Sequence, residues 1–84
     1  MYVEFFGVPR ERAGMSGLEV QADTLGQLLG TLAVRFPSLD QLLSANRLHP
    51  AFVANLNGER FISDPETALG KDDCVLILSA DAGG

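Results

Sequence analysis

The sequence has few basic residues and only one cysteine. Six of its 84 residues are Lys or Arg, against eleven Asp or Glu, and the formal net charge is −5. Nucleic-acid binding needs clustered basic side chains, and the six here are scattered along the chain, so nucleic acid is not an expected partner. One cysteine cannot form an internal disulfide, which suits a reducing compartment, and we expect a cytoplasmic protein.

Long apolar segments and catalytic motifs are also missing. No apolar run approaches the roughly 20 residues of a membrane span, and the N-terminus lacks the basic and apolar regions of a signal peptide. There is no Gly-rich nucleotide-binding loop. His49 is the only histidine, and no Cys, His or carboxylate lies at metal-ligand spacing from it. We therefore expect no membrane partner, no bound metal or cofactor, and no catalysis by this chain alone.

What the sequence does contain is enough apolar residues for one small core. Apolar residues make up 46% of the chain, and its length suits a single domain. The most apolar run, residues 74–78, predicts a buried strand in which Cys74 packs as a small hydrophobe. We expect a folded domain over residues 1–78 and a flexible tail over residues 79–84.

The first residues predict two paired strands. Residues 1–6 alternate in a way typical of a strand, which places Phe6 on the wetter of its two faces. Residues 7–17 contain Gly, Pro and charged residues and predict a loop. Residues 18–22 alternate again, and two strands joined in this way most simply form an antiparallel hairpin.

A single long helix is predicted next. Thr24 and Gln27 fit a capping box, in which each side chain satisfies a free backbone donor at the start of the helix. Pro37 ends the helix, because the residue before a proline disfavours the helical region. One apolar stripe runs along the segment at helical spacing and is expected to pack in the core. It consists of Leu25, Leu28, Leu29, Leu32 and Phe36.

The second half predicts a hairpin and a final strand. Residues 38–46 contain three leucines and predict a short helical turn. Residues 51–56 predict a strand, Asn57-Gly58 a type I′ turn, and residues 59–62 the returning strand. The order is then strand, strand, helix, strand, strand, strand, with the last and most apolar strand in mid-sheet, parallel to the first. This predicts an α+β fold of the β-grasp (ubiquitin-like) type, a mixed four- to five-stranded sheet with one long helix on one face.

A β-grasp domain of this size that ends in Gly-Gly resembles the ubiquitin-like sulfur carriers, and within them it is most similar to the small subunit of molybdopterin synthase. The resemblance spans the whole chain. The residues that carry it are Phe5-Phe6-Gly7, Arg10-Glu11, Gly14, Asn57-Gly58, Lys71-Asp72-Asp73 and Ala82-Gly83-Gly84.

The resemblance implies a chemistry for the tail. A separate ubiquitin-activating-type enzyme would use ATP to adenylate the carboxylate of Gly84. Sulfur from a persulfide donor would then convert this group to a thiocarboxylate. Gly83 and Gly84 give a thin backbone that can pass through a narrow channel. In molybdopterin synthase such a tail enters the large subunit, so the expected partners are the adenylating enzyme and that large subunit, or an equivalent sulfur acceptor.

A docking surface is expected beside the tail. By strand alternation Phe6, Leu76 and Leu78 lie on the face away from the helix and form a candidate apolar patch. The residues before the two glycines are expected to enter the partner. They depart from the prolines and aliphatic residue usual in the family, so we expect them to influence the choice of partner. They are Ser79, Ala80, Asp81 and Ala82.

Other functions stay open on the sequence. The chain could carry sulfur for thiamine thiazole, cysteine or thio-metabolite synthesis, or it could be a protein modifier joined through Gly84 to lysines. A plain binding module with an incidental tail is a further alternative. The extended central region, residues 37–50, favours the molybdopterin type over the shorter thiazole carriers.

Overall fold

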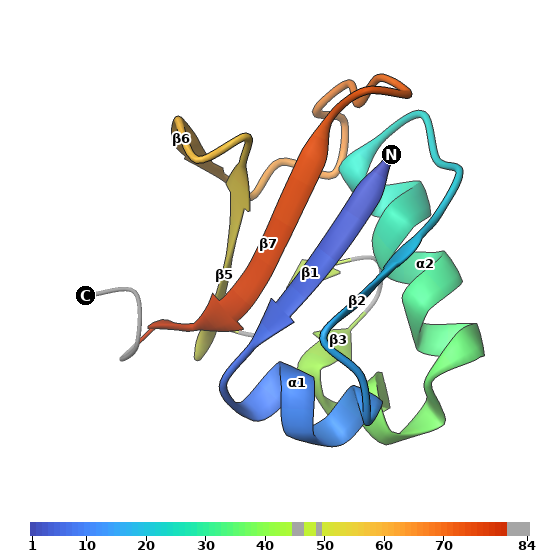
Figure 1. Ribbon diagram of the computed structural model, residues 1–84, viewed down its shortest axis with the longest axis vertical. Coiled ribbons are helices and arrows are strands. Elements are labelled where there is room, and N and C mark those ends of the chain that lie inside the picture. Colours follow the sequence, from blue (N-terminus) through green and yellow to red (C-terminus); the bar gives the residue numbers. More distant parts are fainter. Residues whose placement is uncertain (45–46, 49, 81–84) are drawn as a thin grey trace.

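A five-stranded mixed sheet forms the framework of the protein in the computed structural model (Figure 1). The structure describes residues 1–44, 47–48 and 50–80, and for residues 40–44 and 47 it describes the backbone alone. His49 lies outside the described residues. In chain order the elements are β1 (Tyr2–Phe6), α1 (Val8–Ala13), β2 (Gly17–Glu19), α2 (Leu25–Arg35), η1 (Pro37–Leu42), β3 (Leu43–Ser44), β4 (Arg47–Leu48), β5 (Phe52–Leu56), β6 (Arg60–Ile62) and β7 (Cys74–Ser79).

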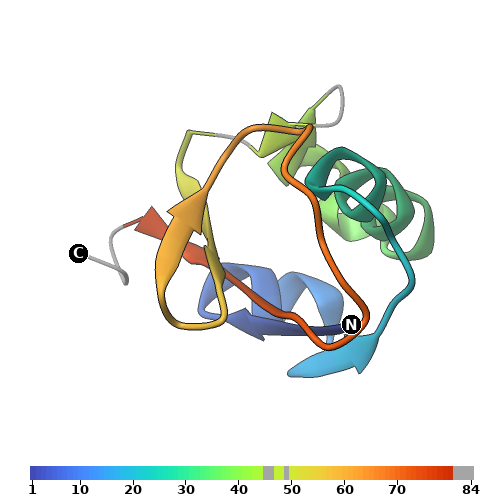
Figure 2. The same ribbon diagram turned by 90° about the horizontal axis from the view of Figure 1, so that it is seen from above.

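The strand order confirms the predicted topology. The large sheet runs β2-β1-β7-β5-β6, so the most apolar strand, β7, lies at its centre. β7 is parallel to β1 and antiparallel to β5. The edge strands are β2, antiparallel to β1, and β6, antiparallel to β5. A single long helix, α2, lies on one side of this sheet, as Figure 2 shows. This is the α+β, β-grasp arrangement that the sequence predicts.

The start of α2 is fixed by the predicted capping box. The backbone N–H of Gln27 donates to Oγ1 of Thr24 at 3.2 Å, and the backbone N–H of Asp23 donates to Oε1 of Gln27 at 2.9 Å. The helix ends at Arg35, two residues before Pro37, which begins η1. Sequence signals therefore fix both ends of this helix.

The hydrophobic core lies between α2 and the sheet. Leucines of the α2 stripe meet the inward side chains of β1 and β7, and Phe36 packs edge-on against Phe5 with ring centroids 5.8 Å apart. Several of these side chains are fully buried, and their removal from water provides the main stabilisation of the fold. The fully buried set is Val3, Pro9, Leu25, Leu28, Leu29, Leu32 and Val75.

Helix α1 occupies part of the segment that we expected to be a loop, so that prediction was wrong. Pro9 lies in its first turn, and Gly14 ends it in the left-handed conformation (φ 75°) with its N–H bonded to the carbonyl of Arg10. Proline just inside a helix and glycine just after it are recognised helix signals, which the charged residues between them obscured. The hydroxyl of Ser38 donates to the carbonyl of Arg12 and ties α1 to η1.

The central region contains more secondary structure than the single helical turn predicted for it. That turn is present as η1, a 3-10 helix. It is followed by an antiparallel pair, β3 and β4, of two residues each, which the sequence did not predict. This region packs on α2, α1 and β5 and adds a second layer beside the core helix.

The two central residues of the β5–β6 turn have the predicted conformation, but the loop is one residue longer than predicted, because Leu56 pairs with Arg60 and β6 begins there. Asn57 and Gly58 both have positive φ angles, 57° and 70°, and the N–H of Glu59 donates to the carbonyl of Leu56 at 3.0 Å. The side chain of Asn57 has a second role, because Nδ2 donates to Oδ1 of Asp73 at 2.9 Å and Oδ1 accepts the backbone N–H of Cys74 at 2.7 Å. The turn is thereby bonded to the start of the central strand.

This contact predicts an acid-sensitive contribution to stability. The hydrogen bond from Asn57, together with one from the backbone N–H of Gly70, holds the pKa of Asp73 below its ordinary value of 3.8. The ionised carboxylate therefore stabilises the folded state above that ordinary value, and this contribution is lost as the pH falls through the lowered pKa. Asp73→Asn is expected to lower the melting temperature at neutral pH.

Thermal melts from neutral pH down to about pH 2 check this prediction. The gap in melting temperature between wild type and Asp73→Asn should close at the acid end. Asp72→Asn is the matched control, because the contacts to Asn57 and Gly70 belong to its neighbour. A gap that stays constant across this range would contradict the role assigned to the Asp73 carboxylate.

Candidate docking face and tail root

The face of the sheet turned away from α2, here called the outer face, holds the predicted patch residues. Cross-strand pairing places Phe6 beside Leu78 and Leu78 beside Val53 in one row. The next row contains Glu4, Leu76, Asn55 and Phe61 from four adjacent strands. Val75 and Ile77, between these positions on β7, point to the core as predicted.

The structure modifies the predicted patch at one position. Phe6 is 52% exposed and Leu76 is half-buried, so both contribute surface. Leu78 lies on the predicted face but is only 8% exposed. Its neighbours in the row, Phe6 and Val53, flank it on both sides, so Leu78 contributes little exposed surface to the predicted patch.

Two further apolar residues of the outer face were missed. Phe61, on β6, is 59% exposed, and Val53, on β5, is half-buried beside Leu78. Alternation along β5 places Val53 on this face, whereas the predicted two-residue turn would have placed Arg60 there instead of Phe61. We call the combined surface the docking patch: Phe6, Val53, Phe61, Leu76 and Leu78.

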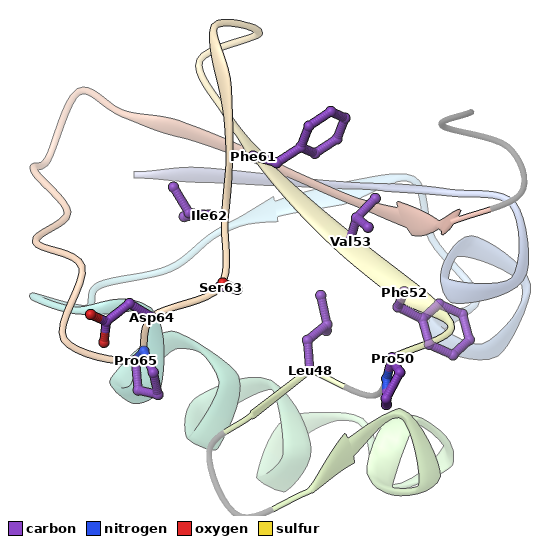
Figure 3. A pocket seen from close by; sticks show the side chains of 9 residues that line it. All are labelled: Leu48, Pro50, Phe52, Val53, Phe61, Ile62, Ser63, Asp64 and Pro65. Atoms are coloured by element: carbon purple, nitrogen blue, oxygen red, sulfur yellow. The ribbon is translucent and has the colours of Figure 1, made fainter.

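A hollow of about 530 Å³ adjoins the docking patch at the β5–β6 edge. Figure 3 shows Phe61 and Val53 on one side of it, and Leu48 and Pro50 on the opposite side. Phe52 and the segment after β6 complete its walls. Since Val53 and Phe61 belong to both surfaces, the apolar area continues around the edge of the sheet.

Cys74 is half-buried on the outer face instead of packing as a buried hydrophobe. Its thiol lies 3.7 Å from Oε1 of Glu4 on the neighbouring strand. Burial raises the pKa of the Cys74 thiol, and the Glu4 carboxylate raises it further. The thiol therefore stays protonated at neutral pH, and the structure gives it no role as a nucleophile.

The tail leaves the domain beside the docking patch. β7 continues through Ser79, which pairs with Phe52, and the N–H of Ala80 donates to the carbonyl of Ala51 at 2.8 Å. Two residues of the predicted tail, Ser79 and Ala80, are therefore bonded to the sheet, and we call these two residues the tail root. The others, Asp81, Ala82, Gly83 and Gly84, lie outside the described residues.

Gly7 keeps the backbone close to this tail root. Its φ angle is 71°, which residues other than glycine rarely adopt, and a Cβ there would lie 3.4 Å from Oγ of Ser79. The turn after β1 is thereby compact where the tail begins. Phe6 precedes this glycine, so the exposed side chain of the docking patch on β1 lies next to the tail root.

No group of three or more His, Cys, Asp or Glu residues within the described segments could hold a metal ion. In the same part of the chain, no helix is long and apolar enough to cross a membrane.

The comparisons with known proteins agree with this geometry. A sheet of this order crossed by one long helix defines the chain as a ubiquitin-like β-grasp protein. The ThiS family profile matches residues 3–84, and the chain belongs to this family of ubiquitin-like sulfur carriers. No match was found among the curated proteins.

Solved structures confirm the fold. The small archaeal modifier protein 1 (SAMP1) of Methanosarcina acetivorans is 23% identical with a TM-score of 0.80, covering 99% of this chain and 94% of its own. A chain of the BexX/CysO complex of Amycolatopsis orientalis is 20% identical, TM-score 0.79, over 99% and 98% of the two chains. A putative molybdopterin converting factor, subunit 1, of Pyrococcus furiosus is 18% identical, TM-score 0.78, over 93% of each.

Proposed function

We propose that the chain carries sulfur as a thiocarboxylate on Gly84 and serves as the small subunit of a molybdopterin synthase in molybdenum cofactor biosynthesis. The observation that carries this proposal is the tail root. The described part of the chain runs to Ala80, which bonds to Ala51 next to an exposed apolar patch, and four residues ending in Gly83-Gly84 follow it in the sequence. The domain thus places the start of the tail beside a surface on which a partner can bind.

The proposed chemistry requires an activated carboxylate. The Gly84 carboxylate attacks the α-phosphate of ATP, pyrophosphate leaves, and an acyl-adenylate forms on the adenylating enzyme. A persulfide then attacks the carbonyl carbon and displaces AMP, which gives an acyl disulfide. A thiol of the donor cleaves the S–S bond and is left as a disulfide, while Gly84 retains the thiocarboxylate.

The length of the tail limits where this chemistry takes place. Residues 81–84 span at most about 14 Å when fully extended. The reactive centre of any partner must therefore lie within about 14 Å of Ala80, close to the surface of the carrier. A partner that reaches Gly84 must therefore contact the surface around the tail root, and the docking patch supplies apolar side chains for that contact.

Two observations bear on the choice of pathway. The described elements η1, β3 and β4 lie in the extended central segment, residues 37–50, whose length favours the molybdopterin type. The fold is shared with a putative molybdopterin converting factor subunit, which supports the same choice. The similarity to SAMP1, a protein named as a modifier, supports a second candidate in which Gly84 is joined to lysines of other proteins.

Complementation tests the pathway. The chain is expressed with the molybdopterin synthase large subunit of its own organism in cells that lack the small subunit, and molybdopterin is measured. Restored synthesis is the expected result, and a chain ending at Gly83 should restore none. Restoration of thiamine synthesis alone would overturn the pathway, and Gly84-dependent conjugates to lysines would favour the modifier.

A further inference from the structure

Asn57 is the asparagine of this chain that is most open to deamidation. The chain has asparagines at positions 46, 55 and 57, and Asn57 alone precedes a glycine. Glycine has no Cβ, so the backbone nitrogen of Gly58 is the least hindered nucleophile that can follow an asparagine. Both residues of the pair are exposed, so water reaches the turn.

Deamidation is an attack by the backbone on the neighbouring side chain. The Gly58 nitrogen loses its proton and bonds to Cγ of Asn57. The bond from Cγ to Nδ2 breaks, ammonia leaves, and a cyclic imide remains. Water then opens the imide at either carbonyl, which gives aspartate or the isomer whose backbone runs through the side-chain carboxyl.

The fold holds the Asn57 amide away from the Gly58 nitrogen. Nδ2 donates to Oδ1 of Asp73 at 2.9 Å, and Oδ1 accepts the backbone N–H of Cys74 at 2.7 Å. The terminal torsion of an amide otherwise rotates over a broad range, and these two bonds fix it toward the start of β7. Both bonds must break before Cγ can turn to the Gly58 nitrogen, so the reaction requires local opening of the turn.

Either product is poorly suited to these surroundings. Aspartate at position 57 places a carboxylate oxygen where Nδ2 now meets the carboxylate of Asp73, and two carboxylates at hydrogen-bond distance repel each other when both are ionised. The isomer adds a backbone atom to a turn whose two central residues have φ angles of 57° and 70°. Both changes weaken the link between the turn and the central strand.

The turn is remote from the tail. On β5, Phe52 pairs with Ser79 of the tail root, whereas Leu56, beside the turn, pairs with Val75 near the start of β7. Deamidation therefore acts on the stability of the domain at the end of the sheet opposite the tail root.

We propose that Asn57 is a site of spontaneous deamidation, that its hydrogen bond to Asp73 slows the reaction in the folded protein, and that the product loosens the start of β7. Opening of this turn then limits the lifetime of the intact domain. The inference does not depend on the proposed function, because it concerns the turn and not the tail.

Intact mass and peptide mapping after storage at mildly alkaline pH test the site, with wild type and Asp73→Ala each kept folded and in urea. In urea both chains should convert Asn57 at the same rate, while Asn55, which precedes Leu56, stays an amide. Folded wild type should convert at least about tenfold more slowly than in urea. Folded Asp73→Ala should convert about fivefold faster than folded wild type, because the amide has lost a bond to a charged group.

Leu29→Val is the control for a general loss of stability, because Leu29 is a buried residue of α2 outside the turn. It should convert more slowly than Asp73→Ala. Equal rates for these two variants, or a folded wild type that converts as fast as in urea, would overturn the protective role of Asp73. An Asn57 that stays an amide in urea would overturn the site itself.

Asn57→Asp tests the effect of the product. It should melt below the wild type at neutral pH, and the difference should shrink toward about pH 2, where both carboxylates take up protons. A melting temperature equal to that of the wild type at neutral pH would overturn the proposed loosening of β7.

Discussion

Replacing Leu28 with alanine is expected to lower the free energy of unfolding by about 2–5 kcal/mol. Leu28 is 0% exposed and lies on the stripe of α2 that packs against β1 and β7. Truncation removes buried apolar surface and leaves a cavity that the surrounding side chains only partly fill. A domain of this length has a total stability of about 4–12 kcal/mol, so a considerable part of it would be lost.

Urea unfolding measures this loss, and the same helix supplies the control. Val34 lies on the opposite side of α2 and is 84% exposed, so Val34→Ala should change the free energy of unfolding by less than about 0.5 kcal/mol. If Leu28→Ala cost no more than Val34→Ala, the assignment of this stripe to the core would be contradicted.

Phe61→Asp is expected to weaken binding of the adenylating enzyme by about thirtyfold or more, with little loss of stability. Phe61 is 59% exposed on the outer face, so the folded domain gains little from it, whereas a partner packed on the docking patch would bury it. Side chains that contribute most to binding at an interface are each worth about 2 kcal/mol or more, which corresponds to about thirtyfold in Kd. Calorimetric titration measures the affinity and a thermal melt the stability.

Val34→Asp is the control for this substitution, because it introduces the same charge at an exposed apolar position on α2. It should bind like the wild type. If Phe61→Asp bound with unchanged affinity, Phe61 would not be part of the interface. Leu78→Asp, which strand alternation alone suggests as the test, is less informative, because Leu78 is only 8% exposed and lost binding would be mixed with lost stability.

The predictable parts of the fold depend on local signals. The Thr24–Gln27 capping box and Pro37 define α2, and the Asn57-Gly58 pair defines the β5–β6 turn. The apolar character of β7 places it in mid-sheet, because a strand with few polar residues needs neighbours on both edges and cover on a face. These features depend on residues close together in the sequence.

The missed parts depend on tertiary contacts. α1 has six residues, too few to form a stable helix alone, and its stability comes from packing against β1, β7 and η1. The β3–β4 pair is also too short to be specified by alternation. Both required knowledge of what lies beside them in space.

The candidate site was predicted to a similar extent. Alternation placed Phe6 and Leu76 on the correct face, but it cannot report how far neighbouring strands shield Leu78. Phe61 became recognisable as part of this face once the pairing of β5 with β6 was known. The roles of Gly83 and Gly84 come from the family resemblance, and their test is chemical.

The most direct test of the sulfur-carrier role is the intact mass of the protein after incubation with the adenylating enzyme, ATP and a persulfide donor. We expect a mass gain equal to the exchange of one oxygen for sulfur, located at Gly84 and absent from a chain that ends at Gly83. No mass gain with any adenylating enzyme of its own organism would contradict the proposal that the chain carries sulfur on Gly84.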